Sequence, residues 1–170
     1  LKAITYEEFA NLRDCKVLIR AHGEPPSTYA KARENNITII DATCPIVRSM
    51  QEKIRKVAEL SRDERGQIVI YGKEGHAEVI GLMSAAGPGG ILVTGKGDLR
   101  RIDYTRPAHL FSQTTKSKVQ YDVVAEIIRL NMEKVSPDHS SSNLKVHNTI
   151  CRQVSEREPR TAAASVNLPA

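Results

Sequence analysis

Short runs of aliphatic and β-branched residues alternate along the chain with longer segments whose apolar residues recur at helical spacing. Strands are expected at residues 17–20, 37–40, 67–71, 91–93, 109–112 and 144–147. Helices are expected at residues 27–34, from residue 45 onward, at 76–86, after residue 117 and at 150–157. This alternation is typical of parallel β-sheets covered by helices. The sequence therefore predicts an α/β protein with helices on both faces of its sheets.

Two of the expected helices have a clear apolar face. In the helix that Pro45 opens, this face consists of Val47, Met50, Ile54 and Val57. In the helix that follows Ser117, it consists of Val119, Val123, Ile127 and Leu130. Ser117 and Gln120 have the spacing of a capping box at the start of that second helix.

Composition is that of a globular protein, with 40% hydrophobic and 26% charged residues and a formal net charge of +5. Basic residues are interleaved with acidic ones, most clearly between residues 48 and 65, which is typical of a solvated helix face. A nucleic-acid-binding domain would instead gather its basic residues in one stripe. A mild positive field still favours a small anionic ligand.

Polar side chains that could bind a ligand or take part in catalysis follow the expected strands. The carboxyl ends of parallel strands share one crevice, where ligands bind in open α/β sheets. Five expected strands would deliver such residues to this crevice, namely His22, Cys44, His76 with Glu78, Thr114, and Cys151.

Each of these residues also has a purely structural interpretation. His22 is by itself more often a loop residue, and Glu78 in a first helical turn is commonly there to offset the helix dipole. Thr114 could cap the next helix. Cys44 and Cys151 could be small buried hydrophobes, although a cysteine at a helix N-terminus has the lowered thiol pKa of a metal ligand.

The remaining signals concern location. The three cysteines form no CxxC pair, and Cys15, at the start of a strand, is interpreted as core or surface filler. No stretch has the length of a membrane span, and the first twelve residues have no signal-peptide core. We expect a reducing cytoplasm, no membrane partner and no nucleic acid. Leu1 in place of Met suggests that the natural start is missing.

Five motifs resemble the 4-hydroxy-3-methylbut-2-enyl diphosphate reductase family, in the same order and at similar spacing. They are RAHGEP from Arg20, DATCP from Asp41, YGKEGHAEVIGLM from Tyr71, SQTT from Ser112 and NTICRQVSEREP from Asn148. The resemblance covers residues 17–159, and we expect the sequence after Pro159 to depart from the family.

The resemblance implies a pseudo-threefold fold of three α/β modules around a central pocket. On this basis residues 1–44 would end the first module, residues 45–143 would form a complete second module, and residues 144–170 would begin the third with a tail that departs from the family. The polar segment 136–143 would be the linker before the third module.

The resemblance also implies a 4Fe-4S cluster that three cysteines hold, with one iron left open to substrate. Cys44 and Cys151 match two of these ligands by motif. The third family cysteine belongs to an N-terminal segment absent from this chain, and Cys15 does not match it. We therefore expect the chain alone to be inactive or nearly so.

By the same resemblance, His22 and His76 would hold the substrate diphosphate. Glu78 would supply a proton to the departing hydroxyl, and Thr114 would position or relay that proton. The implied reaction converts (E)-4-hydroxy-3-methylbut-2-enyl diphosphate to isopentenyl and dimethylallyl diphosphate in non-mevalonate isoprenoid synthesis, with a ferredoxin- or flavodoxin-type electron donor. The alternative is a non-catalytic α/β module that binds phosphoryl ligands without metal.

Overall fold

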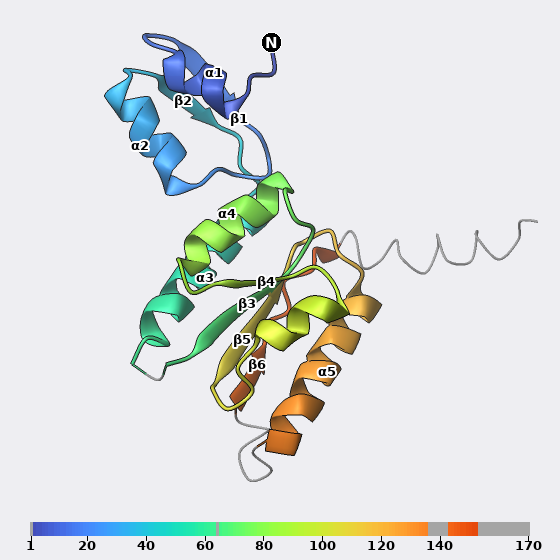
Figure 1. The fold of residues 1–170 in the computed structure, drawn as a ribbon. Helices are drawn as coiled ribbons and strands as arrows, with labels where there is room; N and C mark the ends of the chain where they lie inside the picture. The colour runs from blue at the N-terminus through green and yellow to red at the C-terminus, as the bar shows by residue number, and fades with distance from the viewer. Residues whose placement is uncertain (1, 64, 136–142, 153–170) are drawn as a thin grey trace, which may run out of the picture.

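The fold was obtained as a computed structural model, which describes residues 2–63, 65–135 and 143–152. Its strands are β1 (Lys16–Ile19), β2 (Thr38–Asp41), β3 (Gln67–Tyr71), β4 (Ile91–Val93), β5 (Ala108–Ser112) and β6 (Leu144–Val146). Its helices are α1 (Tyr6–Asn11), α2 (Pro26–Glu34), α3 (Pro45–Leu60), α4 (Ala77–Ala86), the 3-10 helix η1 (Lys96–Arg101) and α5 (Lys118–Val135). The strands form two separate parallel sheets, and the α/β class is confirmed (Figure 1).

The first sheet is small and consists of β1 and β2, which pair in parallel. Helices α1 and α2 pack on it around a core of Phe9, Ala32 and Ile37. The sequence interpretation did not include α1. This helix starts at a capping box in which the Thr5 side chain accepts from the Glu8 N–H while the Glu8 side chain accepts from the Thr5 N–H.

The second sheet has the strand order β4-β3-β5-β6, and every pairing in it is parallel. All five residues of β3 and all five of β5 are buried, as expected for central strands with helices on both sides. Strand β6 pairs with β5 through residues 144–146. Strand β6, which was expected to begin the third module, thus extends the second sheet. The module boundary itself stays a prediction.

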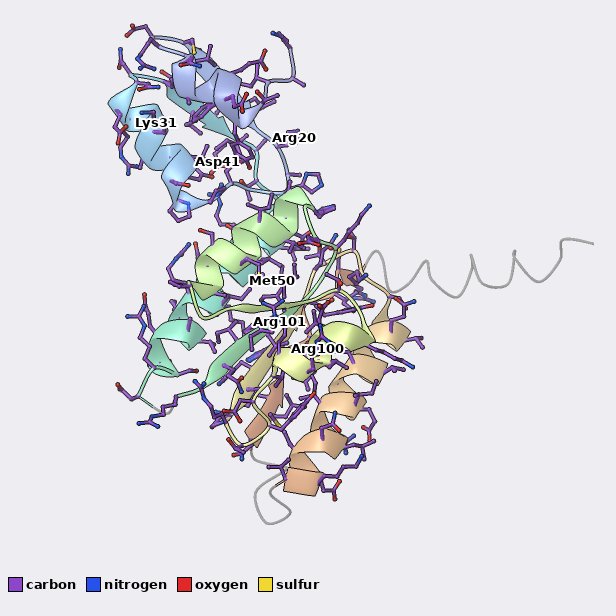
Figure 2. The ribbon with its side chains drawn as sticks, in the orientation of Figure 1. Arg20, Lys31, Asp41, Met50, Arg100 and Arg101 are labelled. Atoms are coloured by element: carbon purple, nitrogen blue, oxygen red, sulfur yellow. The ribbon has the colours of Figure 1, made fainter. Side chains whose placement is uncertain are left out.

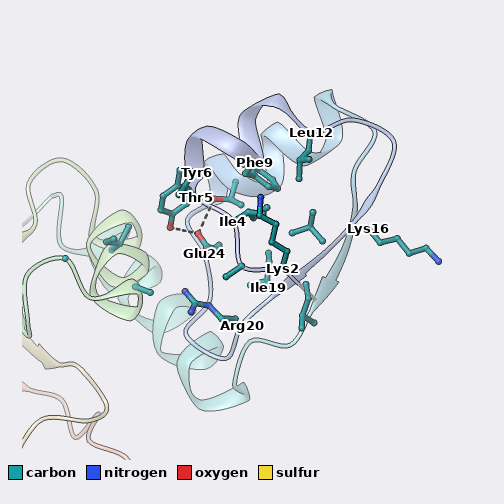
Figure 3. Close-up of a pocket in the computed structure, with 17 residues that line it drawn as sticks. Lys2, Ile4, Thr5, Tyr6, Phe9, Leu12, Lys16, Ile19, Arg20 and Glu24 are labelled. Atoms are coloured by element: carbon teal, nitrogen blue, oxygen red, sulfur yellow. Dashed lines mark hydrogen bonds between the residues drawn. The ribbon is translucent and has the colours of Figure 1, made fainter.

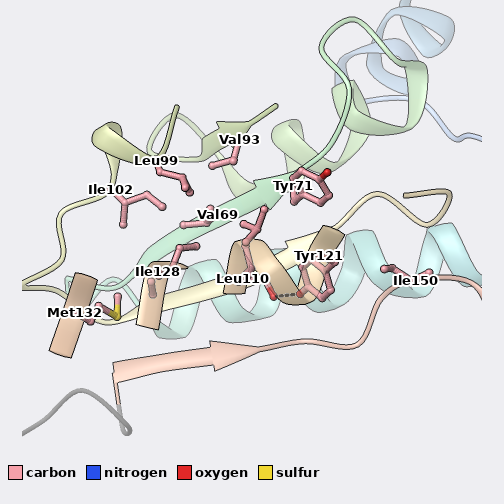
Figure 4. Close-up of a cluster of buried hydrophobic side chains, with 12 residues drawn as sticks. Val69, Tyr71, Val93, Leu99, Ile102, Leu110, Tyr121, Ile128, Met132 and Ile150 are labelled. Carbon is pink, nitrogen blue, oxygen red and sulfur yellow. Dashed lines mark hydrogen bonds between the residues drawn. The ribbon is translucent and has the colours of Figure 1, made fainter. Parts of the chain in front are cut away.

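Helices cover both faces of the second sheet. On one face α3 and α4 enclose a core that includes Met50, Ile70 and Phe111, and Figure 2 marks Met50 within this layer. On the other face η1 and α5 contribute Leu99 and Ile128, among others, to a second core over β3 and β5 (Figure 4). The predicted covering of both faces is confirmed, and it gives this sheet a rigid frame.

The apolar face expected for α5 is wrong for three of its four residues, and only Ile127 packs against the core. The side chains that α5 buries are Tyr121, Val124, Ile128 and Met132. By contrast, Val119 is 66% exposed and Val123 and Leu130 are about half exposed. The helix carries two apolar stripes, and the sheet takes the stripe that contains the large side chains of Tyr121 and Met132.

Most other predicted elements match within one or two residues. The α3 face is confirmed for its first three positions, since Val47, Met50 and Ile54 are buried. The Ser117 hydroxyl accepts from the Gln120 N–H at 3.3 Å, as a helix cap does. Most of the helix expected at residues 150–157 and most of the linker at 136–143 lie outside the described residues.

Candidate functional site

The strand order of the second sheet places a crevice beside its central strands. From β3 the chain passes to β4 on one side and then returns to β5 on the other, so the order reverses between β3 and β5. In open parallel sheets this reversal is where ligands bind, beyond the carboxyl ends of the two strands. The loop after β3 leads to His76 and Glu78, and the loop after β5 carries Thr114.

Glu78 and Thr114 meet at this point in a buried pair. Glu78 lies in the first turn of α4, yet its side chain is only 1% exposed. Its Oε1 accepts from the Thr114 N–H at 2.7 Å, and its Oε2 accepts from the Thr114 hydroxyl at 2.9 Å. A buried carboxyl with both oxygens bound to one residue is held in a single orientation.

His76 caps the helix that carries Glu78. Its Nδ1 accepts from the Glu78 N–H at 3.2 Å, so in the neutral ring the proton is on Nε2, which remains a donor. The preceding turn is tightly packed, because a Cβ atom on Gly72 would lie 2.6 Å from Cγ2 of Val79. A donor ring at a helix N-terminus suits an anionic ligand.

His22 approaches from the first sheet. Its ring lies against that of His76, with the centroids 5.2 Å apart and the planes at 86°. Gly23 follows with a φ of +73°, a backbone conformation that glycine adopts at low cost, and lets the chain turn away. The two histidines therefore form an edge-to-face pair across the junction between the two sheets.

Cys44 is the N-cap residue of α3, and its N–H donates to the carbonyl of Ala21 beside His22. The preceding loop is fixed by Asp41, which accepts from both the N–H and the hydroxyl of Thr43. Burial alone would raise the pKa of Asp41, but the hydrogen bonds from Thr43 and Tyr29 and the nearby charge of Arg48 outweigh burial and lower the pKa. An ionised Asp41 thus holds this loop in place.

Cys151 follows β6, and its N–H donates to the carbonyl of Thr114 at 2.9 Å. The Thr149 hydroxyl ties the same segment to β5, because it accepts from the Ser112 N–H and donates to the Ser112 carbonyl. Both Cys44 and Cys151 are free and partly exposed. Cys15 packs at the edge of the first core, in agreement with its expected filler role.

One continuous path of contacts joins all six residues singled out from the sequence. It runs from Cys44 through Ala21 to His22, across the ring contact to His76, and on through Glu78 and Thr114 to Cys151. The two thiols have the chemistry of iron–sulfur ligands, whereas no group of three or more His, Cys, Asp or Glu side chains with metal-binding geometry occurs among the described residues. The described part of the chain thus contains two free thiols on this path and no group of three such ligands.

A large cavity lies beside this path, and its lining contains none of the six residues. It has a volume of about 860 Å³ and lies between the N-terminal segment, β1 and the start of α4, where Arg20, Gly75 and Ala77 line it (Figure 3). At its rim the Tyr6 hydroxyl donates to Glu24, and burial followed by this hydrogen bond raises the pKa of Tyr6 to about 12.

No described helix is both long and apolar enough to cross a membrane.

Comparison with known proteins identifies the family. The family model described as LytB protein matches residues 2–168. The chain belongs to the LytB protein family. This match extends beyond the range 17–159 on which the resemblance was based, so the expected departure after Pro159 is wrong.

Two relatives of this LytB chain bear the name 4-hydroxy-3-methylbut-2-enyl diphosphate reductase. The protein from Bacteroides thetaiotaomicron is 46% identical over 170 residues, covering 99% of this chain and 57% of the relative. The protein from Parabacteroides distasonis is 50% identical over 164 residues, covering 96% of this chain and 54% of the relative. The chain therefore spans a little over half the length of these relatives.

Two solved structures share the fold of the LytB chain. A structure titled as that of (E)-4-hydroxy-3-methyl-but-2-enyl diphosphate reductase, the terminal enzyme of the non-mevalonate pathway, has a TM-score of 0.69 and 29% identity. The alignment covers 87% of this chain and 48% of that one. A reductase from Plasmodium falciparum has a TM-score of 0.70, covering 88% of this chain and 44% of that one, and at 21% identity it supports the fold alone.

Three residues at this site were not singled out from the sequence. Asp41 holds the loop before Cys44, as described above. Gln113 is buried, and its Oε1 accepts from the Lys73 N–H, which ties the β5 loop to the β3 loop. Gln51 packs against Gly23 and Gly81 from α3. The DATCP and SQTT motifs contain the first two, but nothing in the sequence around Gln51 distinguishes it from a surface residue.

Proposed function

We propose that the whole protein to which this chain belongs is a 4-hydroxy-3-methylbut-2-enyl diphosphate reductase. The observation that carries this proposal is the buried contact between Glu78 and Thr114, at the sheet position where α/β proteins bind ligands. The names of the relatives supply the substrate and the reduction. The products that we propose, isopentenyl and dimethylallyl diphosphate, come from the resemblance of the motifs and require that an allylic hydroxyl be replaced by hydrogen. That replacement consumes two electrons and two protons and releases one water.

His22 and His76 are proposed to bind the diphosphate. The Nε2–H of His76 points away from the helix end that its Nδ1 caps, so it remains available to a phosphate oxygen. The free N–H groups at the start of α4 and the helix dipole favour the same negative charge. His22 lies edge-on to His76 and adds a second donor from the other sheet.

Cys44 and Cys151 are proposed as two of the thiolate ligands of a 4Fe-4S cluster. Both thiols are partly exposed and free of disulfides, and Cys44 is the N-cap residue of α3. When bound, such a cluster would supply the electrons of the reduction. A ferredoxin- or flavodoxin-type donor is the proposed partner, and the three free cysteines fit a cytoplasmic, reducing location.

Glu78 and Thr114 are proposed to deliver the proton that makes the hydroxyl a good leaving group. A hydroxyl can accept and donate at once. When Glu78 carries a proton on Oε2, this 2.9 Å hydrogen bond reverses and Oε2 donates to Oγ1 of Thr114. Thr114 can then take that proton while it gives its own proton to the departing oxygen. The buried position of Glu78 keeps bulk water from competing for that proton.

The test is a Glu78→Gln substitution in the whole protein, reconstituted anaerobically with iron and sulfide. Iron content should stay unchanged while kcat falls about 10²- to 10⁴-fold, because the amide cannot supply the proton. Glu74→Gln, which alters an exposed carboxylate in the same loop, is the matched control and should leave kcat unchanged. Unchanged turnover by Glu78→Gln would remove Glu78 from the mechanism.

The metal-free alternative rests on the ring pair of His22 and His76 at the N-terminus of α4. In that case His22 and His76 would bind a phosphoryl ligand without any redox chemistry. Iron content separates the two proposals. A reconstituted whole protein that binds inorganic diphosphate but retains no iron would favour the binding module.

A further inference from the structure

Two buried side-chain polar atoms lack a hydrogen-bond partner among the described residues, and both lie at the junction between the sheets. They are Nδ1 of His22 and Nε2 of Gln51. A buried amide or ring nitrogen without a partner costs about 1–3 kcal/mol, so such atoms are uncommon in folded proteins. Their location at one junction indicates a shared purpose.

Gln51 reaches this junction through a slot between two glycines. A Cβ atom on Gly81 of α4 would lie 2.5 Å from Nε2 of Gln51, and a Cβ atom on Gly23 would lie 2.9 Å from the same nitrogen. The neighbouring residues Met50 and Leu82 belong to the core between α3 and α4. Nε2 of Gln51 therefore lies against Gly23, the residue that follows His22.

The two unpartnered atoms are chemically complementary. Nε2 of Gln51 is a donor, and Nδ1 of His22 is an acceptor when the ring proton is on Nε2. His76 already has this tautomer, because its Nδ1 accepts from the Glu78 N–H. If His22 adopted the same tautomer, both rings would present an Nε2–H donor.

We propose that Gln51 is a positioning residue for His22: a rotation of these two side chains, which are not hydrogen-bonded to each other in the structure, lets the Gln51 amide N–H donate to Nδ1 of His22 and so holds the ring proton of His22 on Nε2. The use of that proton to bind diphosphate rests on the proposed function, whereas the tautomer itself does not. The slot between Gly23 and Gly81 is what keeps Gln51 in place for this contact.

The direct test is ¹⁵N NMR of the histidine rings in the 170-residue chain, unsubstituted and with Gln51→Glu or Gln51→Met. In the unsubstituted chain Nε2 of His22 should be protonated and Nδ1 should not. Gln51→Glu replaces the donor by an acceptor and should move a proton to Nδ1. Gln51→Met has a similar volume and no donor, and should give a mixture of the two tautomers.

His76 is the internal control, because its Nδ1 is held by the backbone and should stay unprotonated in all three proteins. A His76 signal that stays constant shows that the substituted chains are folded at the site. A His22 ring protonated on Nδ1 in the unsubstituted chain, or one that does not respond to Gln51→Glu, would overturn the proposal.

A packing test covers the case in which a Gln51 variant fails to fold. In Gly81→Ala the amide of Gln51 must shift, because the added Cβ would lie 2.5 Å from its Nε2, and a small loss of stability is expected. Adding Gln51→Ala should relieve that collision and recover part of the lost stability. No recovery in the double variant would show that Gln51 does not occupy the slot and would overturn the proposal.

Kinetics of the whole protein then separate this proposal from the proposed function. Gln51→Met should raise KM for the allylic diphosphate about tenfold, the effect of one weakened hydrogen bond, with a much smaller change in kcat. A His22 tautomer that shifts without any change in KM would contradict the diphosphate role of His22 and leave the contact with Gln51 supported.

Discussion

The first sheet and the second sheet differ in how much of their surface they bury. Strands β3 and β5 of the second sheet are buried along their whole length, with a helical layer on each face. In the first sheet, Ile19 is the one buried residue of β1, and β2 has none. Leu18 and Ile40, which would be core residues in the second sheet, are 42% and 51% exposed.

The proposed site takes residues from both sheets. The second sheet supplies His76, Glu78 and Thr114, whose positions are fixed by buried hydrogen bonds. The first sheet supplies His22 and Cys44 from loops that rest on a much smaller core. The comparison indicates that the residues proposed to deliver the proton belong to the well-packed second sheet, while the contribution of the first sheet depends on contacts at the junction.

The largest expected effect on stability comes from replacing a buried phenylalanine by alanine in the core of each sheet. Phe111→Ala removes a fully buried ring that stacks on His147 with a centroid distance of 4.1 Å, and should lower the free energy of unfolding by about 3–5 kcal/mol. Phe9→Ala removes the one aromatic ring from the three buried residues of the first core. Because that core belongs to the other sheet, hydrogen-exchange protection of β3 and β5 should stay unchanged. Equal loss of protection in β3 and β5 for both variants would show that the two sheets unfold as one unit.

A smaller effect should appear on acidification and should be confined to the second sheet. Burial, followed by the charges of Lys53, His109 and Lys145, lowers the pKa of His147 to about 4. The unfolded chain therefore binds a proton that the folded one does not between about pH 6.5 and pH 4. The stabilisation is fully present above pH 6.5 and is lost as the pH falls toward 4.

Urea unfolding at several pH values measures this effect. We expect the free energy of unfolding to fall by about 1–2 kcal/mol more in the unsubstituted chain than in His147→Asn over that interval. Identical pH profiles would mean that His147 is as accessible to protons in the folded chain as in the unfolded one.

The smallest effects on the free energy of unfolding should come from exposed ion pairs. These effects should be similar for a pair beside the first sheet and a pair beside the second. Lys31 pairs with Glu34 on α2, and Arg129 pairs with Glu126 on α5. Lys31→Ala and Arg129→Ala should each change the free energy of unfolding by less than about 0.5 kcal/mol in thermal or urea unfolding. A clearly larger loss for either variant would mean that surface charge adds to the difference that we assign to the cores.

The same contrast explains which parts of the fold could be predicted from the sequence. Strands β3 and β5 are continuous apolar runs, and they were predicted with errors of at most one residue. Helix α1 was overlooked although Thr5 and Glu8 have the spacing of a capping box, because the helix is only six residues long and has little apolar periodicity. The buried face of α5 was wrong because two apolar stripes compete, and only the shape of the sheet decides between them.

The sequence could predict which residues lie at the site, but not the hydrogen bonds that they make there. Strand ends that share one crevice explained why Glu78 and Thr114 lie close together. The pairing of both carboxyl oxygens with one threonine depends on how closely α4 packs on β3, which no local pattern encodes. The position of Gln51 depends on two glycines that are far apart in the sequence, so it could be recognised only from the structure.

The central claim is that Glu78 and Thr114 act as one proton-delivering unit, and a double-substitution cycle in the reconstituted whole protein tests it most directly. Glu78→Gln, Thr114→Val and the double variant would be compared for kcat with (E)-4-hydroxy-3-methylbut-2-enyl diphosphate. If the two side chains form one relay, the double variant should be no slower than the slower single variant. Losses that multiply, or a Thr114→Val variant that turns over at the unsubstituted rate, would contradict it.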